Sequence, residues 1–181
     1  MTSMHSTDAI VLKRMDVGEA DILYALYTRE YGKMVAVAAG IRKSEAKLRG
    51  HLEPLSLSSV RLIAGRRGEK LIGATVMDFW ENMRGRETTV RLASYVAHRI
   101  DEQCFAGERD PALWDFVYAC FAALNQKDFS GGQAERFIQE FDTGFSACLG
   151  HGDGDGERTF PFISSDTAVA KEPSTEYYRE K

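Results

Sequence analysis

Hydrophobic and polar residues alternate in short runs over the first eighty residues, which is the pattern of β-strands. Turn residues, mostly glycines, separate five such runs. The runs cover residues 9–15, 21–28, 33–40, 55–64 and 69–79. Five short strands in this length of chain predict a small β-barrel or a β-sandwich.

Within the fourth run the alternation changes phase once. Leu55 and Leu57 lie on one face of a regular strand, whereas Val60 and Leu62 lie on the other. A β-bulge at 58–59 would produce this shift in a strand that bends around a barrel. An irregular edge strand would also produce it, and we expect the bulge.

After residue 80 the hydrophobic positions recur every three or four residues, which is the period of an amphipathic helix. One of these segments begins with Pro111 directly after Asp110, a good N-cap followed by a first-turn proline. The pattern predicts three helices of a small bundle, over residues 87–104, 111–126 and 131–150.

The change of period divides the chain into parts. We expect a β-rich domain over residues 1–80, a helical domain over 81–150, and a short C-terminal segment over 151–181 that packs on the helical domain. That segment opens with alternating Gly and Asp and keeps little periodicity, so we expect a short strand or helix near 159–163 and a loosely ordered end. The fold class is α+β.

Charge is distributed unevenly between these parts. The whole chain carries −4, which by itself argues against a nucleic-acid-binding protein. Residues 1–80, however, hold 12 Lys and Arg against 9 Asp and Glu, whereas residues 81–181 hold 11 against 18. The β-rich part is therefore basic and the remainder acidic, so the whole-chain value hides a reversal of sign.

A basic run follows the third predicted strand. Lys and Arg on a strand end and a connecting loop of a small barrel form a positive surface that suits a phosphate backbone. Tyr24, Tyr27 and Tyr31 offer stacking surfaces for bases. A solvated polar loop would show the same run of charges, and the pattern alone leaves both interpretations open. The candidate nucleic-acid-binding residues are Lys33, Arg42, Lys43, Lys47, Arg49, Arg61, Arg66 and Arg67.

Signatures of catalysis are missing from the sequence, which has no nucleophile elbow, Walker phosphate loop, HExxH or GxGxxG. Cys104, Cys120 and Cys148 form no CxxC pair, so they support neither a disulfide framework nor a four-thiolate zinc site. We expect Cys120 and Cys148 to lie in the core. The Gly/Asp loop after His151 lacks the twelfth-position Glu of a calcium loop, which favours a solvated loop. We therefore expect no metal, no cofactor and no enzymatic activity.

Aromatic residues at helical spacing fill the second and third predicted helices. Such stripes are typical of a core, but the second helix is apolar around much of its circumference, so a groove for a partner segment is the alternative. The candidate groove residues are Trp114, Phe116, Tyr118, Phe137 and Phe141.

An ordered set of short motifs in the N-terminal part resembles the N-terminal region of the RecO family of DNA repair and recombination mediators. A later helix that ends at Leu149-Gly150 is similar, more loosely, to a helix of that family. The N-terminal motifs are Ile10-Val11-Leu12, Gly18-Glu19 with Asp21, Thr28 with Gly32, Ala38 and Gly40 with Arg42 and Lys43, and Leu52 with Pro54.

The resemblance implies an oligonucleotide/oligosaccharide-binding (OB) barrel of five strands followed by a helical domain. It also implies a non-enzymatic protein that binds single- and double-stranded DNA and anneals complementary strands. Such a protein cooperates with RecR, with RecF in some cases and with single-stranded-DNA-binding protein to load recombinase on gapped DNA.

Two departures from the family pattern qualify this resemblance. The segment after the last helix contains no cysteine, so the zinc module of many members is not expected, and the chain is short for the family. An alternative function is a protein-interaction adaptor whose barrel is only a structural platform. The N-terminus has no secretory pattern and no stretch is apolar enough to span a membrane, so we expect a cytoplasmic, nucleoid-associated protein.

Overall fold

The computed structural model describes residues 4–17, 19–40, 48–65 and 68–150. Five strands form a closed barrel in the order β1-β2-β3-β5-β4, with β4 returning to β1. Neighbouring strands are antiparallel except β3 and β5, which share a short parallel ladder. The strands are β1 (Met4–Val17), β2 (Asp21–Thr28), β3 (Gly32–Ala38), β4 (Leu57–Gly65) and β5 (Gly68–Asp78), with a 3-10 helix, η1 (Arg49–His51), between β3 and β4.

This barrel confirms the predicted OB-fold, and it decides between the barrel and the sandwich. All five predicted strands are present, and the class is α+β as expected. The interior is filled by alternate side chains of the strands, among them Val11, Tyr24, Leu26 and Leu62. Leu52, which follows η1, is fully buried in the same cluster and so closes the barrel at that point.

The predicted bulge at 58–59 is wrong. Strand β4 pairs with β1 without interruption, and the register shifts against β5 lie at Leu57/Ser58 and Arg61/Leu62. The phase change has another cause: Leu57 faces the helices, whereas Val60 and Leu62 face the barrel interior. Both faces of β4 are therefore buried near its start, and the apolar residues move from one face to the other without a bulge.

In the described part of the chain, four helices follow the barrel. They are α1 (Glu81–Arg84), α2 (Glu87–Gln103), α3 (Pro111–Gln126) and α4 (Gln133–Cys148). The three predicted helices are confirmed, and the Asp110 side chain caps α3 by accepting a hydrogen bond from the Leu113 N–H at 3.0 Å. Helix α1 is a single turn, too short to show a period. Among the helices of the described ranges, none is long and apolar enough to cross a membrane.

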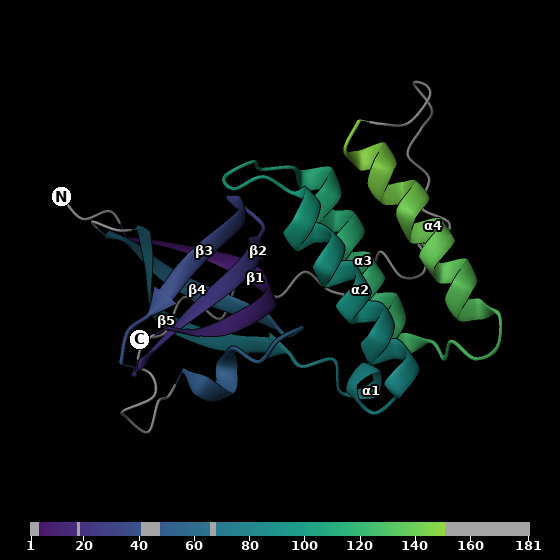
Figure 1. The fold of residues 1–181 in the computed structure, drawn as a ribbon, viewed down its shortest axis with the longest axis horizontal. Helices are drawn as coiled ribbons and strands as arrows, with labels where there is room; N and C mark the ends of the chain where they lie inside the picture. Colours follow the sequence, from purple (N-terminus) through teal and green to yellow (C-terminus); the bar gives the residue numbers. More distant parts are fainter. Residues whose placement is uncertain (1–3, 18, 41–47, 66–67, 151–181) are drawn as a thin grey trace, which may run out of the picture.

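Helices α2 and α3 lie between the barrel and α4 (Figure 1). One hydrophobic cluster joins the outer face of the barrel to these helices, and it includes Ile10, Tyr27, Leu57, Val96 and Trp114. Strand β5 ends at Asp78 and α1 begins at Glu81, so the change of secondary structure falls where the sequence period changes. The predicted C-terminal segment, 151–181, lies outside the described residues.

The turn between β2 and β3 is fixed against the loop that joins α2 to α3. The Thr28 hydroxyl donates to the Gly32 carbonyl at 2.8 Å and accepts from the Tyr31 N–H at 3.1 Å. Gly32 has φ +64°, and a Cβ there would lie 1.9 Å from the carbonyl oxygen of Glu108. Gly107 N–H donates to the Lys33 carbonyl at 2.9 Å, so the loop is hydrogen-bonded to β3 at its first residues.

Replacing Gly32 by Ala should destabilise the protein by about 2–4 kcal/mol, because the left-handed backbone is strained for alanine and the Cβ must displace a backbone carbonyl. Urea unfolding followed by circular dichroism measures the loss. Gly131→Ala is the matched control, since Gly131 has φ +57° with no heavy atom within 4 Å of a Cβ. It should cost only about 1 kcal/mol, and equal losses in the two variants would refute the close approach.

Candidate nucleic-acid interface

Hydrogen bonds hold the described residues on either side of the basic segment after β3, residues 41–49. The Gly40 N–H donates to the Asp21 carboxylate at 2.8 Å, which fixes the chain where the segment begins. Beyond the segment, the His51 carbonyl accepts from the Ser58 hydroxyl at 2.6 Å, and His51 Nδ1 accepts from the Val76 N–H at 3.3 Å. Arg42, Lys43 and Lys47 lie outside the described residues, as does the side chain of Arg49. Their role in binding stays a prediction.

A polar surface covers the outer side of β1, β4 and β5, and we call it the β4 face. Residues directly opposite one another in antiparallel strands point to the same side, so the register defines its members. Three cross-strand rows make up the β4 face: Asp8–Ser59–Thr75, Ser6–Arg61–Gly73 and Met4–Ile63–Lys70.

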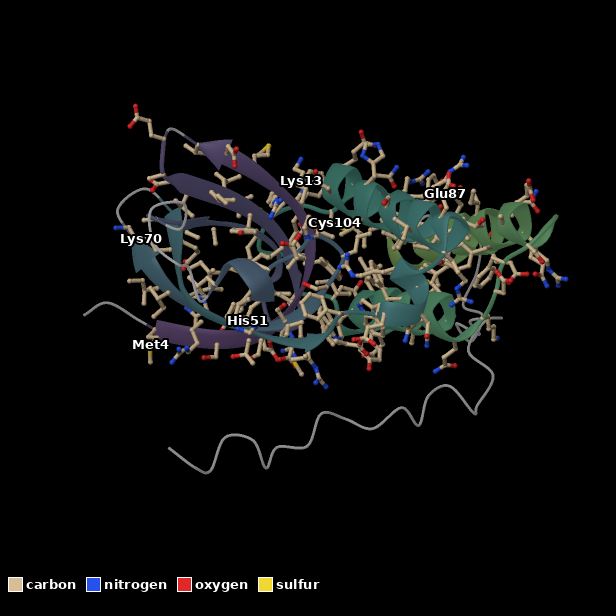
Figure 2. The ribbon with its side chains drawn as sticks, turned by 90° about the horizontal axis from the view of Figure 1, so that it is seen from below. Met4, Lys13, His51, Lys70, Glu87 and Cys104 are labelled. Atoms are coloured by element: carbon tan, nitrogen blue, oxygen red, sulfur yellow. The ribbon has the colours of Figure 1, made fainter. Side chains whose placement is uncertain are left out.

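The β4 face presents positive charge away from the helices. Arg61 and Lys70 are both exposed. Lys70 and Met4 lie at the end of the barrel far from the helices (Figure 2). Gly65 pairs with Gly68 next to Lys70, and Arg66 and Arg67, which lie outside the described residues, connect them in the chain. The sequence reading missed Lys70, and the pairing of β4 with β5 was the signal that could have found it.

The one carboxylate of the three rows is Asp8, in the row nearest the helices. Burial raises its pKa above the ordinary value, and the nearby charge of Glu30 raises it further, whereas Arg29 lowers it. The raised pKa means that the local environment disfavours the negative charge of Asp8. The rows that hold Arg61 and Lys70 contain no acid.

Lys33 is placed differently from the other candidates. Its ammonium group pairs with the Asp101 carboxylate on α2 at 3.1 Å and also donates to the Asp101 carbonyl, and its side chain is only 16% exposed. The ammonium group of Lys13 pairs with the same carboxylate. Figure 2 shows Lys13 at the junction of the barrel and the helices. Lys33 therefore joins the barrel to α2, and its charge is neutralised there.

Burial alone would raise the pKa of Asp101. The hydrogen bonds and charges of Lys13 and Lys33 outweigh burial, so the pKa of Asp101 lies below its ordinary value of 3.8. The carboxylate therefore stays ionised between the two lysines at neutral pH.

For two of the three tyrosines, the predicted role of stacking on bases is wrong, because their side chains are buried. Tyr24 is fully buried in the barrel interior, and Tyr27 is buried against Trp114, with ring centroids 6.0 Å apart. Only Tyr31, at 37% exposure, is accessible, and its ring packs edge-on against His5. Alternation in β2 could not show that its outer face is covered by a helix far along the chain.

The candidate groove in the helical part is a packed core. Trp114, Phe116, Phe137 and Phe141 are each at most 5% exposed, and Tyr118 is half-buried against the same cluster. These side chains pack in one cluster between the outer face of the barrel, α3 and α4. The two phenylalanines of α4, Trp114 and Phe116 therefore present no open surface.

The three cysteines are free, and Cys120 and Cys148 are buried in the core as predicted. Burial raises the pKa of the half-buried Cys104 thiol to about 11, so this group is a poor nucleophile at neutral pH. Within the described ranges no three His, Cys, Asp or Glu side chains are grouped to hold a metal ion. The Gly/Asp loop after His151 lies outside those ranges.

A second exposed surface, on the outer side of β1, β2 and β3, is mainly apolar, with Lys13 and Asp21 among its members. Leu23 pairs with Met15 on one side and with Val37 on the other. Met15, Val17 and Val35 are exposed by 46%, 45% and 44%. Sequence reasoning did not single out this surface, which we call the β2 face, because its residues read as ordinary strand alternation.

Comparison with known proteins links this fold to DNA repair proteins. Residues 1–80 match the family described as recombination protein O, N terminal. The DNA repair protein RecO of Pelotomaculum thermopropionicum is 29% identical over 148 residues, which cover 82% of this chain and 56% of the relative. That of Myxococcus xanthus is 31% identical over 125 residues, 68% of this chain and 51% of the relative. The chain thus spans about half the length of these curated relatives.

Replacing Asp101 by Asn should cost about 1–2 kcal/mol at neutral pH, because Lys33 loses its ion pair while Lys13, 47% exposed, is largely stabilised by solvent. Since folding lowers the pKa of Asp101, the ion pairs stabilise the protein above pH 3.8 and lose this effect as the pH falls through the folded pKa. Urea unfolding at neutral pH and near pH 3 measures both.

The exposed Asp115 on α3 provides the control for this experiment. Asp115→Asn should change stability by less than about 0.5 kcal/mol at either pH. If the loss in Asp101→Asn were the same at low and neutral pH, the ion pairs would not be its cause.

Proposed function

Residues 1–80 match the N-terminal domain of the RecO family, and we propose that the chain is a RecO-family protein, a non-enzymatic DNA-binding protein of DNA repair and recombination. It binds single- and double-stranded DNA through the barrel. The β4 face and the basic segment after β3 contact the phosphates. The proposal rests chiefly on one observation: the exposed Arg61 and Lys70 lie on one outer face of the barrel. They belong to β4 and β5, the two strands that Arg66 and Arg67 connect in the chain.

The chemistry of the β4 face favours contacts to the nucleic-acid backbone. Arginine and lysine donate to phosphate oxygens, and the hydroxyl groups of Ser6 and Thr75 can donate to the same oxygens. Contacts to phosphates carry no sequence information, so binding depends weakly on sequence. They also leave the base edges free, which is the condition for annealing two complementary strands.

The helical part orients the DNA by repulsion. Residues 81–150 hold 7 Lys and Arg against 11 Asp and Glu, so DNA is disfavoured on this side and directed to the far end of the barrel. We propose that the protein acts in the cytoplasm at the nucleoid. There it assists recombinase loading at gaps together with RecR, and in some settings with RecF and single-stranded-DNA-binding protein.

A second candidate function, an adaptor that binds another protein, is favoured by the β2 face. Its exposed Met15, Val17 and Val35 form an apolar surface of the kind found where proteins associate. The two functions differ in their effect on DNA binding, since a pure adaptor has no affinity for DNA at physiological salt. Val35→Lys would weaken protein association in an adaptor and leave DNA binding unchanged or slightly stronger.

The DNA-binding proposal is tested with the double variant Arg61→Ala, Lys70→Ala. Fluorescence anisotropy of a labelled single strand, measured between about 50 and 200 mM salt, gives the dependence of affinity on salt. Each lost phosphate contact should reduce the log–log slope by about 0.7, so the double variant should lose about 1.4. Arg42→Ala with Lys43→Ala tests the basic segment in the same way.

Lys127→Ala is the matched control, because Lys127 is an exposed lysine at the end of α3 on the acidic side of the molecule. Its slope should equal that of the native protein. A flat salt response of the native protein would refute DNA binding through phosphates. A normal response that the double variant and the control both retain would show that the β4 face is not the binding surface.

A further inference from the structure

Gly73 lies in the interior of β5, where glycine is unfavourable because it adds flexibility and packs no side chain. Arg61 on β4 faces it directly in the register. A Cβ built on Gly73 would lie 2.5 Å from Arg61 Nε, 2.7 Å from Nη2 and 2.9 Å from Cζ. The guanidinium group therefore occupies the space that any other residue at position 73 would fill.

A β-bulge next to Gly73 shapes this contact. Arg61 pairs with Gly73 and Leu62 with Leu71, so Ile72 is an extra residue in β5. Bulges bend and twist a strand locally and can redirect side chains. Ile72 is 43% exposed, while Gly73 beside it is buried under the arginine. The bulge and the glycine together leave the space on β5 in which the Arg61 side chain lies.

The N–H donors of the Arg61 guanidinium group are available to a ligand. No hydrogen bond or ion pair joins Arg61 to another residue in the described part of the chain, and its side chain is exposed. On the same face its neighbours are the hydroxyls of Ser6 and Ser59 and the exposed Lys70. This arrangement differs from that of Lys33, whose charge is taken up by Asp101.

We propose that Gly73 is a positioning residue for nucleic acid, which holds the Arg61 guanidinium on the sheet as a preformed contact for one phosphodiester group. The inference rests on the proposed function and deepens it. An arginine already restricted on the sheet loses less side-chain freedom when it binds than a freely moving one. A planar guanidinium can donate two parallel hydrogen bonds to one phosphate, which a lysine cannot do.

The test is a double-mutant cycle of Gly73→Ala and Arg61→Ala on single-stranded DNA, measured by anisotropy at fixed salt. Arg61→Ala should weaken binding roughly tenfold, as expected for one charge-assisted contact. Gly73→Ala should weaken it roughly three- to tenfold, because the methyl group displaces the guanidinium and its restriction is lost. In the Arg61→Ala background, Gly73→Ala should have no further effect, since the group that it positions has been removed.

Two further variants make the result decisive. Gly132→Ala is the matched control, because Gly132 lies in the helical part with no heavy atom within 4 Å of a Cβ, and it should bind as the native protein does. Arg61→Lys keeps the charge and the native strand but has no planar fork. It should bind roughly threefold or more weakly than the native protein even if Gly73→Ala fails to fold.

The outcomes separate this inference from the proposed function. Absence of salt-dependent binding by the native protein would overturn the function itself. Native binding that Gly73→Ala leaves unchanged would overturn only the role of Gly73, as would an equal effect of Gly73→Ala with and without Arg61. Full affinity of Arg61→Lys would show that charge alone acts at this position and would also overturn the preformed contact.

Discussion

The rest of the structure depends on one constraint: near the helices, the barrel is as apolar outside as inside. In β1, Ala9 and Val11 pack into the interior while Ile10 and Leu12 pack outward, and all four are buried. Removing one such side chain from water stabilises the fold by about 1.5–3 kcal/mol. The outward set gains this only when α2 and α3 cover it, so the barrel and the helices share a core and form one structural unit.

That shared core decides which surfaces of the barrel remain available. One side carries Tyr27 and lies under Trp114, so an aromatic residue that could have stacked on a base is part of the interior. The uncovered outer surface is divided between the basic β4 face and the apolar β2 face. Asp101 on α2 pairs with Lys33 and Lys13 at the junction, and the charge of the largely buried Lys33 is neutralised there. Arg61 and Lys70 are the exposed cations of the three β4-face rows.

Several short motifs of the N-terminal part have local structural reasons. Thr28 and Gly32 close the β2–β3 turn against the loop between α2 and α3, while Asp21 holds the backbone at Gly40. Leu52 closes the barrel interior, and the Pro54 carbonyl accepts a hydrogen bond from the Arg84 guanidinium at 2.6 Å. The bond from Gly40 to Asp21 holds the backbone where the basic segment begins, and the other contacts stabilise the barrel and its junction with the helices. They give these residues, which have no binding chemistry of their own, a structural role.

The sequence by itself determined the elements. Strand alternation, the helical period and the Asp110-Pro111 start are local properties, and each predicted strand and long helix is present. Only the tertiary structure decided which face of each element meets solvent, because a hydrophobic or charged residue reads the same whether it faces the barrel, a helix or water. For this reason the sequence did not show that Lys33 lies at the junction or that the helix aromatics form a core. The roles of Lys70 and Gly73 likewise follow only from their pairing with β4. The charge of each residue and the spacing of hydrophobic residues can be taken from the sequence. The exposure of a residue depends on what packs against it from elsewhere in the chain.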